Sequence, residues 1–146
     1  MNKIAGDVFV DDRGSVRFVN GFDFKAVKRF YQVENHELGF VRAWHGHLKE
    51  AKYIYVARGA ALIGAVKLLY EAQTQSYREA EPPQKWVISD TKPAVIYIPE
   101  GYANGFMNLT ADTIIQFFST ASLEDSRGDD IRFPYNQWDI WQIEKR

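Results

Sequence analysis

The sequence predicts an all-β domain of antiparallel strands, with a jelly-roll barrel or sandwich as the favoured form. Three observations support this prediction. Short segments rich in β-branched and aromatic residues recur along the chain, turn-forming Gly, Pro and Asp residues separate them, and helical patterns are weak. A chain of 146 residues is too short to build two hydrophobic cores, so we expect a single domain over residues 1–146.

Each expected strand is an apolar run bounded by breakers such as Arg58-Gly59, Pro93 and Pro99. The expected strands cover residues 16–19, 30–33, 40–44, 53–56, 61–66, 86–88, 95–98, 114–118 and 139–143. Segment 22–29 is expected to form a helical turn or two. The polar segment 70–80 is expected to be a long hairpin excursion, partly helical, that Pro82-Pro83 ends because proline removes a backbone donor.

Composition excludes several classes of function. The chain is 46% hydrophobic with a net charge of -1, which excludes intrinsic disorder and gives no basic footprint for nucleic acid. Without cysteine there are no disulfides, thiolate nucleophiles or Cys-ligated metals. No run of 18 apolar residues and no signal-like N-terminus is found, so we expect no membrane partner and a cytoplasmic location.

Two of the three histidines alternate as His45-x-His47. Residues i and i+2 of a strand face the same side, so both imidazoles are expected to face the barrel cavity. Histidine is a good general base near neutral pH, and the ammonium of Lys52 is suited to hold an enolate oxygen. The pair of His45 and Lys52 therefore predicts proton abstraction from a carbon next to a ketone.

Two blocks of the sequence resemble the paired signature motifs of the cupin superfamily. They are Gly39-x5-His45-x-His47-x4-Lys52-x6-Gly59 and Pro99-x-Gly101-x2-Asn104-x3-Asn108. In metal-binding cupins a glutamate ligand stands at the position of Lys52 and a histidine ligand at that of Asn104. An ammonium repels a cation and an amide is a poor ligand beside imidazole, so we expect neither a metal nor another cofactor.

Over most of its length the chain resembles the dTDP-4-dehydrorhamnose 3,5-epimerase family of RmlC-like cupins. The resembling segments are Asp11-Asp12-Arg13-Gly14, Gln32-Val33-Glu34-Asn35, Arg42-Ala43-Trp44-His45 and Ile98-Pro99-Glu100-Gly101-Tyr102-Ala103-Asn104-Gly105-Phe106. The resemblance implies a cupin jelly roll, a homodimer, and a nucleotide-diphosphate sugar as substrate in deoxysugar and surface polysaccharide biosynthesis. It also implies that His45 removes the proton next to the C4 ketone and that Lys52 stabilises the enolate.

The chain departs from this family at the acid. The family's tyrosine, which returns a proton from the opposite face, falls on Phe117, and the aspartate that orients the base is not found. Epimerisation at a single carbon can use water or one of Tyr31, Tyr97 and Tyr102 as acid, and inversion at C3, at C5 or at both stays open. His47 is similar instead to the H-x-H of 3,4-ketoisomerases acting on dTDP-4-keto-6-deoxyglucose, in which histidine serves as acid and base.

Further residues, Tyr97 and Phe117 among them, are candidates for substrate binding. Arg13 and Arg42 present planar guanidinium forks suited to the diphosphate, and Gln32 and Asn104 are suited to sugar hydroxyls. Trp44 is expected on the face opposite His45, packed between sheets or subunits. The aromatic tail 131–141 is expected to dock on its own sheet or on a partner, after a solvated acidic loop at 124–130.

Three hypotheses remain open from the sequence. A metal-independent epimerase or keto-isomerase predicts exchange of solvent deuterium into the substrate that depends on His45. A non-catalytic sugar-binding cupin predicts binding without exchange. A metallo-cupin in which Glu50 replaces the missing ligand predicts stoichiometric metal in the purified protein.

Overall fold

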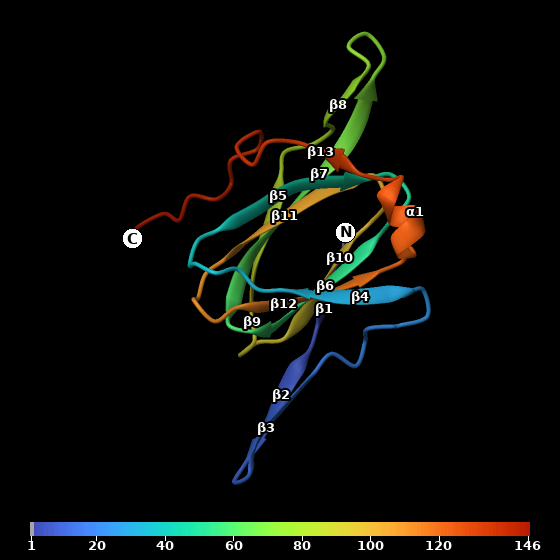
Figure 1. Cartoon of the computed structure of the whole chain (residues 1–146). Coiled ribbons are helices and arrows are strands. Elements are labelled where there is room, and N and C mark those ends of the chain that lie inside the picture. The colour runs from blue at the N-terminus through green and yellow to red at the C-terminus, as the bar shows by residue number, and fades with distance from the viewer. Residues whose placement is uncertain (1) are drawn as a thin grey trace.

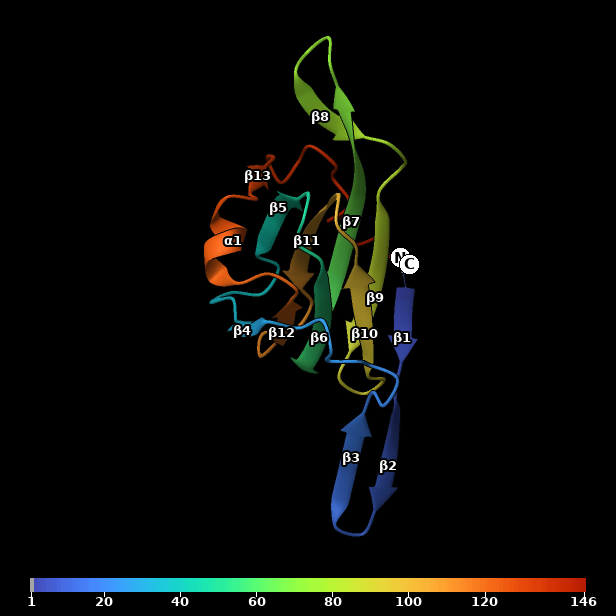
Figure 2. The ribbon, with the colours of Figure 1, turned by 90° about the vertical axis from the view of Figure 1, so that its right-hand side faces the viewer.

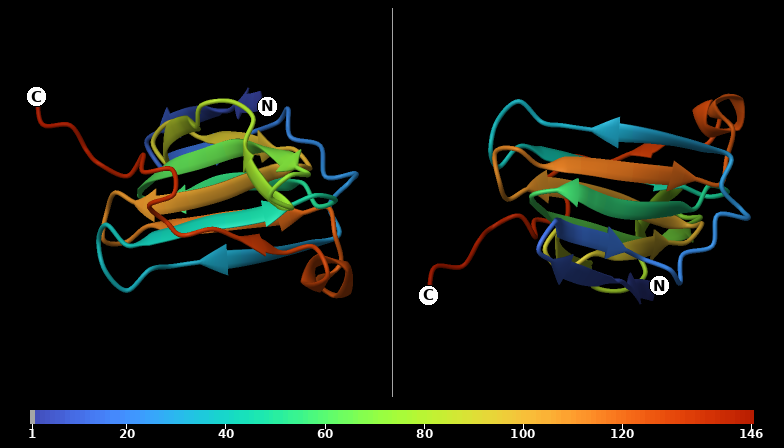
Figure 3. Two further views of the ribbon diagram at one scale, coloured as in Figure 1. Left: turned by 90° about the horizontal axis from the view of Figure 1, so that it is seen from above. Right: turned by 90° about the horizontal axis from the view of Figure 1, so that it is seen from below.

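Two antiparallel sheets face each other and enclose the core (Figure 3). The computed structural model describes residues 2–146. One sheet has five strands in the order β1 (Asn2–Ala5), β10 (Ala94–Ile98), β6 (Lys52–Arg58), β12 (Ile114–Ser119) and β4 (Arg29–Val33). Its neighbours are far apart in sequence, as in a jelly roll, and the all-β prediction is confirmed.

The second sheet has six strands. Its order is β13 (Ile131–Arg132), β5 (Val41–His47), β11 (Tyr102–Asn108), β7 (Ala60–Glu71) and β8 (Ser76–Glu79), with β9 (Gln84–Ser89) also paired to β7. A separate hairpin of β2 (Asp7–Asp11) and β3 (Gly14–Phe18) projects from one end of the body, and the β7–β8 hairpin projects from the other (Figures 1 and 2). The expected hairpin at 70–80 is therefore confirmed, without a helical part.

Apolar side chains between the sheets form the main core. On β6, Ile54 and Val56 are buried, while Tyr53 and Tyr55 between them face outward. The same alternation on the facing and neighbouring strands contributes Ile63, Ile96, Ile115 and Phe117. This period of two fixes which side chains reach the interior.

A second cluster lies on the outer face of the six-stranded sheet, beneath the C-terminal tail. Trp44 is fully buried there, with its ring 5.5 Å from that of Trp138 and 5.1 Å from that of Trp141. The tail is tied to β5 by backbone hydrogen bonds between Trp44 and Phe133. Gly64 makes room for this packing, because a Cβ there would lie 2.7 Å from Trp44 and 3.2 Å from Trp141. The tail therefore docks on its own sheet, which was one of the two expected alternatives; the other was docking on a partner.

Several expected elements are corrected. Residues 139–143 form no strand, because the tail crosses the face of the sheet and contacts it through side chains instead of pairing along an edge. Segment 22–29 contains no helix: it has a turn at residues 25–26 and ends at Arg29, the first residue of β4. The acidic stretch begins with a helix, α1 (Leu123–Arg127), whose Ser122 hydroxyl accepts a hydrogen bond from the Asp125 amide. No helix in the described part of the chain is long and apolar enough to cross a membrane.

Candidate active site

A cavity of about 140 Å³ lies between the sheets and brings together most of the candidate residues. Strands of both sheets contribute to it because their inward-facing side chains converge where the sheets face each other. The lining residues are Tyr31, Val33, Arg42, His45, Lys52, Asn104, Phe106 and Phe117. Six residues selected from the sequence as candidate catalytic or substrate-binding residues are among them: Tyr31, Arg42, His45, Lys52, Asn104 and Phe117.

His45 is half-buried on β5 and lies opposite Asn104 of β11, whose side-chain amide donates to the His45 carbonyl at 3.4 Å. Burial is the main factor that lowers the pKa of His45 from 6.5 to about 4, and the positive charges of Arg132 and Lys52 lower it further, partly offset by Asp130. The imidazole is therefore neutral at neutral pH. A neutral imidazole in a cavity has the protonation state that a general base requires.

Lys52 enters the cavity from β6 and lies against an aromatic wall. Its Nζ is 5.8 Å from the ring centre of Tyr31 and 5.9 Å from that of Phe117. These two rings stack at 5.0 Å and are nearly parallel. Such faces attract a cation, so the wall stabilises the ammonium. Phe117 has no proton to donate, whereas Tyr31 carries a hydroxyl.

Arg42 extends from β5 and is anchored at its side chain. Its Nε donates to Asn35 Oδ1 at 2.7 Å, and Asn35 in turn donates to Asn108 Oδ1 at 3.2 Å. The anchor restrains the guanidinium while its terminal nitrogens keep their donors. Asn35 was not selected from the sequence as a site residue, although it ends the segment Gln32-Val33-Glu34-Asn35 that carried part of the resemblance.

His47 does not line the cavity, which corrects the expectation that both imidazoles converge there. The segment after α1 covers this end of β5: the side chain is buried, and its Nδ1 is paired with the carbonyl of Asp129. Burial, followed by the charge of Lys52, lowers the pKa of His47, while the Asp129 carbonyl and the nearby carboxylates oppose the shift. His47 instead neighbours Glu50, whose Oε1 is 3.7 Å from Nδ1.

Two further expectations are corrected by strand alternation. Gln32 faces outward on β4, between the inward-facing Tyr31 and Val33, and donates to Gln116 at 2.8 Å. Tyr97 faces outward on β10 and packs on Tyr53 with ring centres 4.8 Å apart. Neither side chain is placed to meet a ligand in the cavity.

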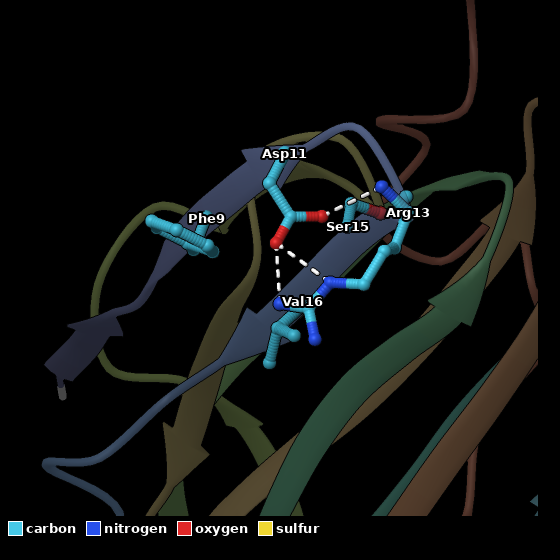
Figure 4. Close-up of a pocket in the computed structure, with 6 residues that line it drawn as sticks. Phe9, Asp11, Arg13, Ser15 and Val16 are labelled. Carbon is cyan, nitrogen blue, oxygen red and sulfur yellow. Dashed lines mark hydrogen bonds and ion pairs between the residues drawn. The ribbon is translucent and has the colours of Figure 1, made fainter.

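Arg13 lies at the tip of the β2–β3 hairpin, which stands away from the body of its own chain (Figure 2). Its side chain is 84% exposed and pairs with Asp11, through Nε at 3.0 Å and Nη2 at 2.5 Å (Figure 4). This pair lowers the pKa of the Asp11 carboxyl. Within one chain Arg13 therefore does not join the cavity.

Among residues 2–146, no group of three or more His, Cys, Asp or Glu side chains is arranged to hold a metal ion. Glu50, considered above as a substitute ligand, is instead engaged by hydroxyl groups. Ser119 donates to one carboxylate oxygen at 2.7 Å and Ser126 to the other at 2.6 Å. The sequence carried no signal for this contact, because the partners are distant along the chain.

Comparison with known proteins places these observations in a family. A family model described as dTDP-4-dehydrorhamnose 3,5-epimerase matches residues 3–143. An enzyme of that name from Sinorhizobium fredii is 34% identical over 100 residues, which are 63% of this chain and 47% of the relative. The chain thus spans about half the length of the curated relative it matches.

Solved structures show the same fold. The dTDP-4-dehydrorhamnose 3,5-epimerase of Sulfolobus tokodaii is 25% identical with a TM-score of 0.70, over 91% of this chain and 77% of that one. ChmJ of Streptomyces bikiniensis, a 3'-monoepimerase, is 18% identical with a TM-score of 0.73, over 94% and 72% of the two chains. With the family model matched along nearly its whole length, the chain belongs to the dTDP-4-dehydrorhamnose 3,5-epimerase family.

Proposed function

We propose that this chain is a metal-independent epimerase of a nucleotide-linked 4-keto-6-deoxy sugar in deoxysugar biosynthesis. The observation that carries the proposal is the neutral imidazole of His45 in the same small cavity as the ammonium of Lys52. His45 takes a proton from the carbon next to the C4 ketone, and Lys52 stabilises the oxygen of the enolate that forms. The ligand in the ChmJ complex, dTDP-quinovose, supports dTDP as the nucleotide.

Inversion also requires a proton from the opposite face of the enolate. Phe117 cannot supply it, and Tyr31 is the tyrosine whose side chain lines the cavity. The stacking of Tyr31 on Phe117 fixes its ring in place. We therefore assign the acid to Tyr31, and a single acid supports inversion at one carbon. The alternative of a 3,4-ketoisomerase receives less support, since His47 lies outside the cavity lining.

The first prediction concerns the base. With dTDP-4-keto-6-deoxyglucose in deuterium oxide, the wild-type protein is expected to remove the C3 proton signal, followed by proton NMR. His45→Ala is expected to slow this exchange by about 10²- to 10⁴-fold, the usual contribution of a positioned base. His36→Ala, on an exposed loop, is the matched control and should exchange at the wild-type rate. Unchanged exchange in His45→Ala would eliminate His45 as the base.

The second prediction is the pH dependence. A base acts only when unprotonated, so exchange measured as kcat/KM is expected to stay level from pH 7 downward and to fall near pH 4, the pKa of His45, instead of near 6.5. Arg132→Ala removes a positive charge that lowers this pKa, so its acid limb should move to higher pH. An acid limb at pH 6.5 in the wild type would contradict a desolvated base.

The third prediction separates the acid from the base. Tyr31→Phe is expected to retain deuterium exchange but to lose inversion by about 10²-fold, because the enolate is then reprotonated from the side of the base. Product stereochemistry follows from the NMR coupling constants. Tyr97→Phe on the outer face is the matched control and should change neither rate. Equal losses of exchange and inversion in Tyr31→Phe would remove Tyr31 as the acid.

We also propose that the chain forms a homodimer, in which a second copy brings its cavity to the projecting β2–β3 hairpin. Two features support this assembly. The outer face of the five-stranded sheet carries an aromatic cluster in which Phe24 and Phe30 are 60% and 68% exposed. The second feature is the exposed guanidinium of Arg13 at the tip of the hairpin. Because this hairpin stands away from the cavity of its own chain, Arg13 can bind the diphosphate of a substrate only in the cavity of a second copy.

The fourth prediction tests this assembly. Light scattering is expected to give twice the mass of the chain. Arg13→Ala is expected to raise KM about tenfold or more with little change in kcat, because it removes binding of a group remote from the reaction. Arg78→Ala, exposed on the opposite hairpin, is the control and should leave KM unchanged. A monomer that is fully active would overturn the dimer proposal.

A further inference from the structure

Behind Lys52, outside the cavity lining, lies a fully buried carboxylate that the proposed reaction does not use. The side chain of Glu50 is 0% exposed and stands in the turn between β5 and β6. Its two oxygens accept hydrogen bonds from neutral hydroxyls, Ser119 of β12 and Ser126 of α1. The turn itself is held by Asp129, whose carboxylate accepts the backbone amides of residues 48, 49 and 50 at 2.7–2.9 Å.

Three basic groups surround this carboxylate. Arg29 Nη2 lies 3.6 Å and Lys52 Nζ 3.9 Å from Oε2, while His47 Nδ1 lies 3.7 Å from Oε1. These separations are ion-pair distances, longer than hydrogen bonds. At 3.9 Å the negative charge attracts Lys52 without forming an N–H···O hydrogen bond to it, so the N–H donors of Lys52 are not used by Glu50.

A second cation, Arg29, lies close to Lys52, and the carboxylate of Glu50 offsets the repulsion between them. Arg29 lies near the same ring and the same carboxylate oxygen as Lys52, with its guanidinium carbon 5.0 Å from the ring centre of Tyr31. In a poorly solvated interior two like charges repel strongly, and an unpaired buried charge is costly. Glu50 is in contact with both cations and offsets that repulsion.

Resting on the proposed function, we propose that Glu50 is a positioning residue for Lys52. It is the buried counter-charge that holds the ammonium against the Tyr31–Phe117 wall with its donors free to meet the developing enolate oxygen. Without the charge, Lys52 is displaced from Arg29 and the enolate loses its partner, while binding of the nucleotide remote from this point is unaffected.

The coupling is tested first without any substrate. Glu50→Gln keeps an acceptor for a serine hydroxyl and removes the charge, and Lys52→Met removes the ammonium at similar size. We expect each single variant to unfold at lower urea concentration than the wild type, and the double variant to unfold no earlier than Glu50→Gln alone. Additive losses would show that the two groups do not interact and would overturn the proposal.

The catalytic consequence is tested by the same cycle in deuterium exchange. Glu50→Gln is expected to lower kcat by about 10²-fold with KM nearly unchanged, and the double variant is expected to match Lys52→Met. Ser126→Ala is the matched control: it removes a part-buried hydrogen bond to the same carboxylate but keeps the charge, so it should lower stability while kcat stays near the wild-type value. An equal loss of kcat in Ser126→Ala would reduce Glu50 to a structural role.

A third readout reports the charge directly. Glu50 is one of the groups that raise the pKa of His47 against the lowering effect of burial, so this pKa should fall further in Glu50→Gln when followed by NMR.

If Glu50→Gln does not fold, Glu50→Asp retains the charge but withdraws it from Lys52, and its kcat should fall with KM unchanged. A wild-type kcat in Glu50→Asp would overturn the proposal. Absence of exchange in the wild type would instead remove the proposed function and leave the stability cycle to decide the coupling.

Discussion

The direction in which β5 turns each side chain is the constraint on which the site depends. Arg42 and His45, three residues apart, both line the cavity because the pairing of β5 with β11 shifts register between them. Trp44 turns to the outer face, where the tryptophans of the C-terminal tail cover it completely, and the next residue, His45, turns into the cavity. A slip of one residue would exchange these faces, placing an indole in the cavity and an imidazole under the tail. The packing of the tail on Trp44 therefore helps to fix which face His45 occupies, although no tail residue lines the cavity.

Low solvent access affects two groups in the site, the imidazole of His45 and the ammonium of Lys52. It lowers the pKa of His45 and so keeps the imidazole neutral. The same poorly solvated surroundings make the ammonium of Lys52 dependent on nearby groups, here the rings of Tyr31 and Phe117 and the carboxylate of Glu50. An uncharged imidazole and a charged ammonium can thus lie in one small cavity.

Much of this arrangement could be predicted from the sequence. The features that could not be predicted depend on strand register and on contacts between distant residues. The spacing of His45 and Lys52 in a known motif, and the rule of alternation, placed both residues and turned Trp44 away. Gln32 was misplaced because polarity pointed it inward, whereas the register of β4 against β12 turns Tyr31 inward instead. The contact between Ser126 and Glu50 joins residues 76 positions apart, so no local sequence pattern predicts it.

The volume of the cavity limits which part of the proposed substrate it can hold. A space of about 140 Å³ is well below the few hundred cubic ångströms that usual small-molecule sites enclose. Under the proposed function, this space holds the sugar ring and leaves the nucleotide to surfaces outside. The proposed chemistry and the proposed nucleotide recognition then use separate surfaces, so a change of nucleotide leaves the catalytic interior unaltered.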